Sequence, residues 1–182
     1  MYAKITKLDD AFQLFDEMTQ RKPLPSVIKF NQLLQVVAKL KHYSSLIDLF
    51  KKMVSIGVLV DVYTTNTVIM CCCQMYRTSE GFAIVAYGLK RGVVPNVFTF
   101  NTILNGLILE DRILEAKRLF KKVIKEQLCD LDVVTYNTMI KGLCKFGNND
   151  TAISLLRMMN ERGYKPIVSH MTPSLIVFAR TK

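Results

Sequence analysis

Residues 133–167 read VVTYNTMIKGLCKFGNNDTAISLLRMMNERGYKPI, and the spacing of their apolar residues predicts two short helices. One apolar series steps by i, i+3, i+4 and i+7, which places its members on a single helix face: Tyr136, Met139, Ile140 and Leu143. A second series repeats that spacing after a polar break: Ala152, Leu155, Leu156 and Met159. The stretch therefore predicts a helical hairpin with one apolar face on each helix.

Polar residues, glycines and a proline mark the expected ends of these helices. Thr135 is expected to cap the first helix by accepting a hydrogen bond from a free backbone N–H, and Asn148 is expected to cap the second. Gly147 and Gly163 are expected to end the two helices, because glycine readily adopts the left-handed conformation found there. Pro166 then prevents the second helix from restarting.

The same pattern recurs along the chain with a period of 35 residues. Asparagine precedes an apolar run at steps of 35, 35 and 36, at Asn31, Asn66, Asn101 and Asn137. The apolar positions of the second helix keep the same register, at Phe15, Phe50, Val85, Phe120 and Leu156. One pair of short helices is only marginally stable in water and needs neighbours of the same kind. The sequence therefore predicts an all-α fold, an α-solenoid of helix–turn–helix repeats.

The register divides the chain into a partial repeat, four complete repeats and a tail. Residues 1–26 match the end of a repeat whose first helix is largely missing. Residues 168–182 form a non-repeat tail, because Pro173 interrupts what would be the first helix of a fifth repeat. The complete repeats are residues 27–61, 62–96, 97–132 and 133–167, the third being one residue longer than the others.

Composition favours a folded, basic protein. Apolar residues make up 50% of the chain and the mean hydropathy is +0.20, which suits helices buried between neighbours. The apolar stretch 54–76 contains Asp61 and several Thr and Asn, so no membrane insertion is expected. The net charge of +10, from 25 Lys and Arg against 15 Asp and Glu, favours a polyanionic partner such as nucleic acid. Lys39, Lys141 and Lys145 on the expected first helices are candidates for phosphate contacts.

No pattern in the sequence supports catalysis or a bound cofactor. The five cysteines contain no CxxC pair, so we interpret them as reduced structural thiols and not as metal ligands: Cys71, Cys72, Cys73, Cys129 and Cys144. His42 and His170 are isolated, and neither a Gly-rich phosphate loop nor an HExxH motif occurs. The sequence therefore predicts a protein that is not an enzyme and holds no metal.

The unit VVTYNTMIKGLCKFG, with the apolar pairs, Gly and Pro that follow it, resembles the pentatricopeptide repeat family over residues 1–167. RKPLPSVIKF and the following LLQVVAKLKHY further resemble P-type, restorer-of-fertility-like proteins of plant organelles. The resemblance implies a right-handed superhelix that binds single-stranded RNA selectively in organellar RNA processing or stability. It implies a mitochondrial location, with the chloroplast as the alternative, and a nuclease or other processing factor as a further partner.

The resemblance also assigns side chains to base recognition. The fifth and last residues of a repeat would read one base, which gives four pairs: Asn31 with Asp61, Asn66 with Asn96, Asn101 with Asp132, and Asn137 with Ile167. The second residues would sandwich the bases: Ile28, Tyr63, Phe98 and Val134. By the family's code Asn with Asp prefers U and Asn with Asn prefers a pyrimidine. Ile167 departs from that code, so only Asn137 favours a pyrimidine at the fourth position.

Two other interpretations stay open from the sequence. Helical repeats also form scaffolds that bind proteins, and such a scaffold needs no register of Asn, Asp and aromatic residues. The chain also has features of a fragment or a truncated, inactive gene product. Its first repeat is incomplete, no Arg- and Ser-rich leader precedes it, and the fifth repeat is broken. A base reader with four repeats is expected to bind RNA weakly.

Overall fold

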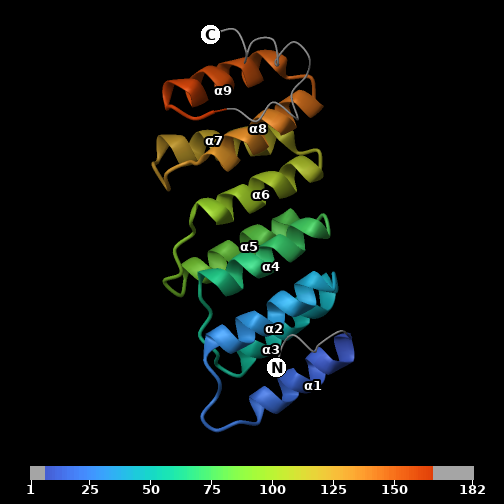
Figure 1. Ribbon diagram of the computed structural model, residues 1–182. Coiled ribbons are helices and arrows are strands. Elements are labelled where there is room, and N and C mark those ends of the chain that lie inside the picture. Colours follow the sequence, from blue (N-terminus) through green and yellow to red (C-terminus); the bar gives the residue numbers. More distant parts are fainter. Residues whose placement is uncertain (1–6, 166–182) are drawn as a thin grey trace. The chain divides into compact units, whose positions relative to one another are not determined.

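The computed structural model describes residues 7–165, and every regular element in that range is an α-helix (Figure 1). In chain order the helices are α1 (Leu8–Thr19), α2 (Val27–Lys39), α3 (Tyr43–Ser55), α4 (Val62–Gln74), α5 (Thr78–Leu89), α6 (Val97–Leu109), α7 (Ile113–Lys125), α8 (Val133–Lys145) and α9 (Asn149–Glu161). They belong to two compact units, Met1–Pro95 with α1 to α5 and Asn96–Lys182 with α6 to α9. Among residues 7–165 no helix combines the length and the apolar character needed to cross a membrane. The expected tail, residues 168–182, lies outside the described residues.

Pairs of helices repeat through both units. The first helix of each pair starts with a valine, at steps of 35, 35 and 36 residues: Val27, Val62, Val97 and Val133. A three-residue turn leads to the second helix, which contacts the first in all four pairs. This arrangement confirms the predicted all-α fold of helix–turn–helix repeats.

One side chain caps the start of each of α4, α6 and α8, and at α8 it lies three positions before the expected cap. The residue just before α4, α6 and α8 accepts a hydrogen bond from the backbone N–H three residues later: Asp61 from Thr64, Asn96 from Thr99, and Asp132 from Thr135. The prediction that Thr135 caps α8 is therefore wrong, because Thr135 is the third residue of that helix and its N–H is the group being capped. In α4 and α6 the threonine hydroxyl also accepts from the backbone N–H of the cap, which completes a capping box.

Residues with positive φ end the helices at two recurring positions. After the first helices these residues are Lys41, Tyr76, Asp111 and Gly147, and after the second helices they are Gly57, Gly92, Gln127 and Gly163. The predictions for Gly147 and Gly163 are confirmed, with φ of 68° and 78°. Side chains other than glycine enter this region at a steric cost. Asn148 stands before α9 as expected, but its side chain accepts no capping bond; its Nδ2 donates to the Phe146 carbonyl oxygen.

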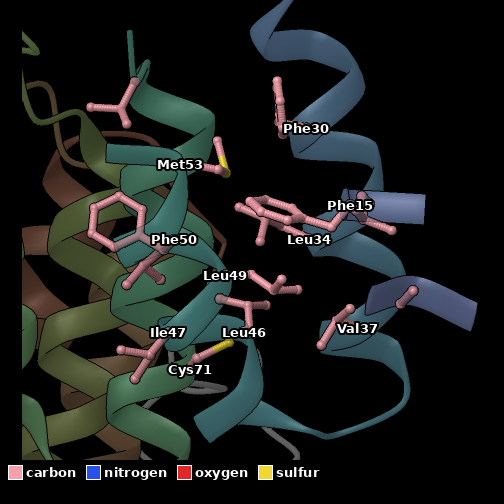
Figure 2. Close-up of a cluster of buried hydrophobic side chains, with 14 of the residues drawn as sticks. Phe15, Phe30, Leu34, Val37, Leu46, Ile47, Leu49, Phe50, Met53 and Cys71 are labelled. Atoms are coloured by element: carbon pink, nitrogen blue, oxygen red, sulfur yellow. The ribbon is translucent and has the colours of Figure 1, made fainter. Parts of the chain in front are cut away.

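The core of the first unit lies between facing helices. Phe15 of α1 packs edge-on against Phe30 of α2, with ring centroids 5.8 Å apart. Figure 2 shows side chains of α2 such as Leu34 facing those of α3 such as Leu49, and both of these leucines are buried. Each fully buried Leu or Phe contributes about 1.5–3 kcal/mol. Packing between neighbours therefore stabilises helices that are too short to persist alone.

Gly81 of α5 faces Ile69 and Cys73 of α4. Cys71, Cys72 and Cys73 are buried free thiols on α4. Burial raises the pKa of Cys71 to about 12 and that of Cys72 to about 11. On α5 a Cβ added at Gly81 would lie 3.5 Å from Ile69 Cγ2, which is an ordinary van der Waals contact. The two helices therefore approach closely without a clash.

The second unit is packed in the same way. Phe120 of α7 contacts Tyr136 of α8 edge-on, with ring centroids 5.8 Å apart. Gly142 of α8 lies against Ile108 of α6, and a Cβ added to this glycine would fall 2.6 Å from Ile108 Cδ1. The absence of a side chain at Gly142 therefore sets how closely α6 and α8 can pack.

Candidate nucleic-acid interface

One large apolar side chain near the start of each first helix is exposed to solvent. Ile28, Tyr63, Phe98 and Val134 are 63%, 69%, 56% and 57% exposed. Each lies three residues before the recurring Asn, which places the two side chains on the same face of the helix, one turn apart. The side chains predicted to sandwich bases are therefore accessible within their own units.

The amide of Asn31 is held against the carboxylate of Asp61, the cap of α4. Asn31 Nδ2 donates to both Asp61 oxygens at 3.0 Å. The Thr64 hydroxyl oxygen lies 2.7 Å from Asn31 Oδ1 and 2.9 Å from Asp61 Oδ1, so it links the two side chains. The structure thus brings together the two residues predicted to read the first base. It adds Thr64, which sequence reasoning did not include in the site.

A similar pair joins α6 to the start of α8. Asn101 Nδ2 donates to Asp132 Oδ1 at 3.2 Å, and the same oxygen accepts from the Thr135 backbone N–H and hydroxyl at 2.8 Å each. Burial raises the pKa of Asp132, but the hydrogen bonds from Thr135 and Asn101 favour the ionised form and outweigh burial. The pKa of Asp132 therefore lies below its ordinary value. A carboxylate faces the Asn101 amide at neutral pH.

The two pairs differ in how the amide oxygen of the asparagine is satisfied. Thr64 donates to Asn31 Oδ1, whereas Thr135 donates to the carboxylate of Asp132. Among the described residues Asn101 Oδ1 has no hydrogen-bond partner, although it is buried. A buried acceptor left without a donor costs about 1–3 kcal/mol. A donor supplied by a bound molecule would remove that cost.

The other two predicted pairs stay predictions. Asn66 is buried on α4, and Asn96 caps α6 in the other unit, so their joint role stays a prediction. Asn137 Nδ2 donates to the Val133 carbonyl oxygen of its own helix at 2.8 Å. Its predicted partner, Ile167, lies outside the described residues.

The candidate phosphate-binding lysines are exposed. Lys39 is on α2, and Lys141 and Lys145 are on α8. Lys145 Nζ lies 2.7 Å from Asp111 Oδ1, so a phosphate would have to compete with that carboxylate. Lys39 and Lys141 have no ion-pair partner within the part of the chain that the structure describes, which leaves their charge available.

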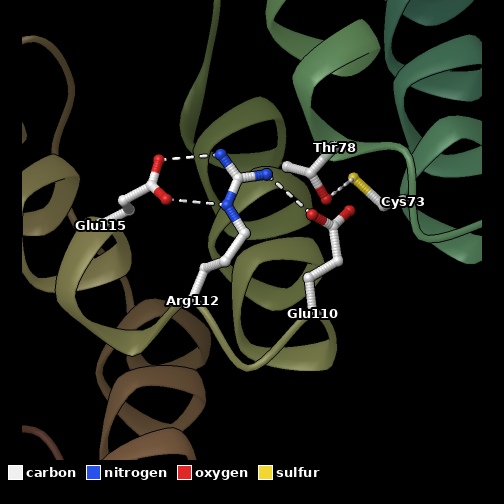
Figure 3. A network of polar contacts seen from close by, with 5 residues as sticks. All are labelled: Cys73, Thr78, Glu110, Arg112 and Glu115. Atoms are coloured by element: carbon white, nitrogen blue, oxygen red, sulfur yellow. Dashed lines mark hydrogen bonds and ion pairs between the residues drawn. The ribbon is translucent and has the colours of Figure 1, made fainter.

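Arg112, just before α7, is occupied by two carboxylates (Figure 3). Its Nε and Nη2 donate to Glu115 at 2.8 Å each, and its Nη1 donates to Glu110 at 2.7 Å. The hydrogen bonds from Arg112 hold the pKa of Glu115 below its ordinary value. This network ties the turn between α6 and α7 to the start of α7, so we assign Arg112 a structural role.

Models of one family match most of the chain. The model described as "PPR repeat" matches residues 91–123 and 127–160, "PPR repeat family" matches residues 25–74, and "Pentatricopeptide repeat domain" matches residues 1–39. The matches lie on both units and together span more than half of the sequence.

Relatives from Arabidopsis thaliana have the same repeats in their names. A protein named as a mitochondrial pentatricopeptide repeat-containing protein is 36% identical over 110 residues, which cover 60% of this chain and 18% of that protein. Another with such a name is 45% identical over 73 residues, covering 40% of this chain and 13% of the relative. This chain therefore spans less than a fifth of the length of either relative.

Solved structures share the arrangement of helices. The pentatricopeptide repeat protein PPR10 in complex with an 18-nucleotide psaJ RNA element is 26% identical, with a TM-score of 0.74 over 88% of this chain and 23% of that chain. The PPR domain of Arabidopsis thaliana protein-only RNase P 1 in complex with tRNA also has a TM-score of 0.74, over 95% of this chain and 90% of that chain; at 16% identity it shows the fold alone. The paired helices, their register and these matches agree, and the chain belongs to the pentatricopeptide repeat family.

Proposed function

We propose that the chain binds single-stranded RNA, with each complete pair of helices contacting one base. The observation that carries the proposal is the exposed apolar side chain that recurs at one position in four successive repeats, always one turn before an asparagine. The proposed contacts to bases are made by Ile28, Tyr63, Phe98 and Val134, and by the pairs Asn31 with Asp61, Asn66 with Asn96, Asn101 with Asp132, and Asn137 with Ile167.

Stacking would supply much of the affinity. Tyr63 and Phe98 offer flat faces to solvent, and stacking of a base on an aromatic ring contributes about 1–3 kcal/mol. Ile28 and Val134 would make apolar contact with a base face but cannot stack in the same way. Aromatic contact is therefore expected mainly at the second and third repeats.

The asparagine–aspartate pairs are suited to reading the edge of a base. Capping bonds fix the carboxylates of Asp61 and Asp132, and each carboxylate orients an amide that has both a donor and an acceptor. The unpartnered Oδ1 of Asn101 could accept the N3–H of a uracil after a small rotation that exposes it. This chemistry agrees with the preference for U that the family's code gives to Asn with Asp.

The net charge and the relatives support the same proposal at larger scale. A charge of +10 favours a polyanion, and Lys39 and Lys141 offer exposed charges to phosphates. PPR10 has been solved with an RNA element bound, and several relatives are named as mitochondrial. We infer a role in organellar RNA processing or stability, in the mitochondrion, with the chloroplast as the alternative. In this role the chain binds RNA without catalysis, and a partner nuclease performs any cleavage.

Fluorescence anisotropy of the full chain with labelled oligo(U), oligo(C) and oligo(A), at low and moderate salt, tests the proposal. We expect oligo(U) to bind most tightly and oligo(A) least. Replacing Asn101 by Ala should weaken binding of oligo(U) about two- to tenfold, as expected for loss of one hydrogen-bonding group, and should reduce the preference for U over A. Asn66→Ala should act in the same direction.

Asn105→Ala is the matched control, because Asn105 lies exposed on the same helix as Asn101 but is not one of the four recurring asparagines. It should leave both affinity and preference unchanged. Equal affinity of the unmodified chain for the three oligonucleotides would contradict base reading, even if binding through charge persisted.

A further inference from the structure

An apolar groove lies in the second unit. Most of its lining residues belong to α7 and α9, the second helices of their pairs, whereas the recurring asparagines lie on the first helices. The groove runs between α7 and α9, has α8 as its floor, and encloses about 270 Å³. Its apolar surface comes from Phe120, Ile124, Met139, Leu143, Leu155 and Met158. An engineered cavity of about 150 Å³ lined by such residues holds one benzene molecule, so this groove has room for about two apolar side chains.

One rim of the groove is a row of lysines. Lys117, Lys121 and Lys125 line it from α7 at i, i+4 and i+8, which aligns them along one helix face over about 12 Å. Lys121 and Lys125 are exposed, and none of the three has an ion-pair partner among residues 7–165. The lining residues on the α9 rim are uncharged: Thr151, Ser154 and Met158. The groove is thus apolar inside and positively charged along one side.

We propose that this groove docks an acidic amphipathic helix of a partner protein. Such a helix would place two apolar side chains in the groove and a row of Asp or Glu, spaced by four residues, opposite the three lysines. A row of cations about 12 Å long matches several carboxylates in series, whereas the single carboxylate of a fatty acid would use only one of them. The inference is independent of RNA reading, because Met139 and Leu143 lie on a different face of α8 from Asn137.

The charge of the groove also argues against two other occupants. Residues 167–182 of this chain contain no Asp or Glu and would bring Arg180 and Lys182 toward the lysine row. RNA has the right charge but would place polar sugars and phosphates against an apolar floor. Occupation by RNA remains an outcome that the experiment distinguishes.

The test uses a synthetic peptide helix with Glu at every fourth position and two Leu on the adjacent face, labelled for anisotropy against the full chain. We expect saturable binding that weakens with salt, and no binding of the same peptide with Lys in place of Glu. The double variant K121E/K125E should raise the Kd about tenfold or more. S154W, which fills the groove from its exposed rim, should weaken binding at high salt as well as at low salt.

The matched control is R118E/K122E, which changes the charge of α7 by the same amount at exposed positions outside the groove. It should alter the Kd less than about threefold, and circular dichroism should show both double variants to be equally helical. Equal loss of binding in the two double variants would show that the peptide responds only to net charge, and it would overturn the proposal. So would displacement of the peptide by oligo(U), binding of laurate in place of the peptide, or failure of the peptide to bind the intact chain.

Discussion

Asp132 serves two helices with one side chain. It caps the start of α8, and it also receives the amide of Asn101 from α6. Asp61 does the same for α4 and α2. The residue proposed to complete one base-reading pair therefore also caps the first helix of the next repeat. RNA binding and folding stability thus depend on the same carboxylate.

Replacing Asp132 by Ala should lower the free energy of unfolding by about 1 kcal/mol at neutral pH, because the cap is lost. Asp132→Asn should cost less, since Asn96 fills the same position before α6. The pKa of Asp132 is lowered in the folded state, so its ionic contribution is present above the ordinary Asp pKa of about 3.9 and is lost as the pH falls through the lower, folded value. Urea unfolding at pH 7 and pH 3 should therefore show the difference between the native chain and Asp132→Asn shrinking in acid. A constant difference would contradict this assignment.

Phe98 should matter for RNA and not for folding. Its ring is 56% exposed, so Phe98→Ala removes little packing and should change the free energy of unfolding by less than about 0.5 kcal/mol. The same change should weaken RNA binding by about 1–3 kcal/mol if a base stacks on the ring. Anisotropy and thermal melts on one preparation compare the two effects, and Phe100→Ala, at a buried position of the same helix, should show the reverse pattern.

At the scale of the helix, the apolar periodicity predicts which segments are helical and which faces are buried, but it does not predict every capping residue. The spacing of Tyr136, Met139, Ile140 and Leu143 was sufficient because burial requires one apolar face, and all four are buried. The predicted cap of α8 is wrong because Asp132 and Thr135, three residues apart, can both accept hydrogen bonds, and the spacing alone does not say which of them precedes the helix. The family resemblance assigns Asp132 a role in base reading and none in capping.

Local sequence also does not predict the left-handed residues at helix ends that lack glycine. Glycine at positions 147 and 163 signals the left-handed conformation, whereas Tyr76 and Gln127 adopt it with side chains that give no such signal. The repeat register was the available signal, since each stands where another copy has glycine. Thr64 was missed for a related reason: its hydrogen bond to Asn31 joins residues from successive repeats and has no local pattern.

Two glycines on packed helices should respond oppositely to alanine. At Gly142 the added methyl would meet Ile108 at 2.6 Å and force that side chain to move, so Gly142→Ala should destabilise the fold by about 1 kcal/mol despite the better helix propensity of alanine. At Gly81 the new contact is an ordinary 3.5 Å, so Gly81→Ala should stabilise it by up to about 1 kcal/mol. Urea midpoints measure both, and Gly142→Ala together with Ile108→Val should recover part of the loss. Equal effects at the two sites would show that propensity alone decides.

For the whole molecule, charge and repeat number set different limits on RNA binding. The net charge of +10 would allow many phosphate contacts, but four complete repeats with one base each engage about four phosphates. A plot of log affinity against log salt concentration should then have a slope of about −3 or shallower. Lys39→Gln should reduce its magnitude by about 0.7, whereas Lys51→Gln, on a second helix and already paired with Asp48, should not. A much steeper slope would indicate that RNA coats the basic surface.

The consecutive buried thiols of α4 are a built-in probe of local opening in the first unit. Alkylating reagents attack thiolates, and burial with a pKa near 12 or 11 keeps Cys71 and Cys72 protonated and out of reach while α4 is packed. The rate at which iodoacetamide modifies them should therefore follow the fraction of molecules in which α4 has left its neighbours. Mass spectrometry can then report this transient opening without an extrinsic dye or an engineered cysteine.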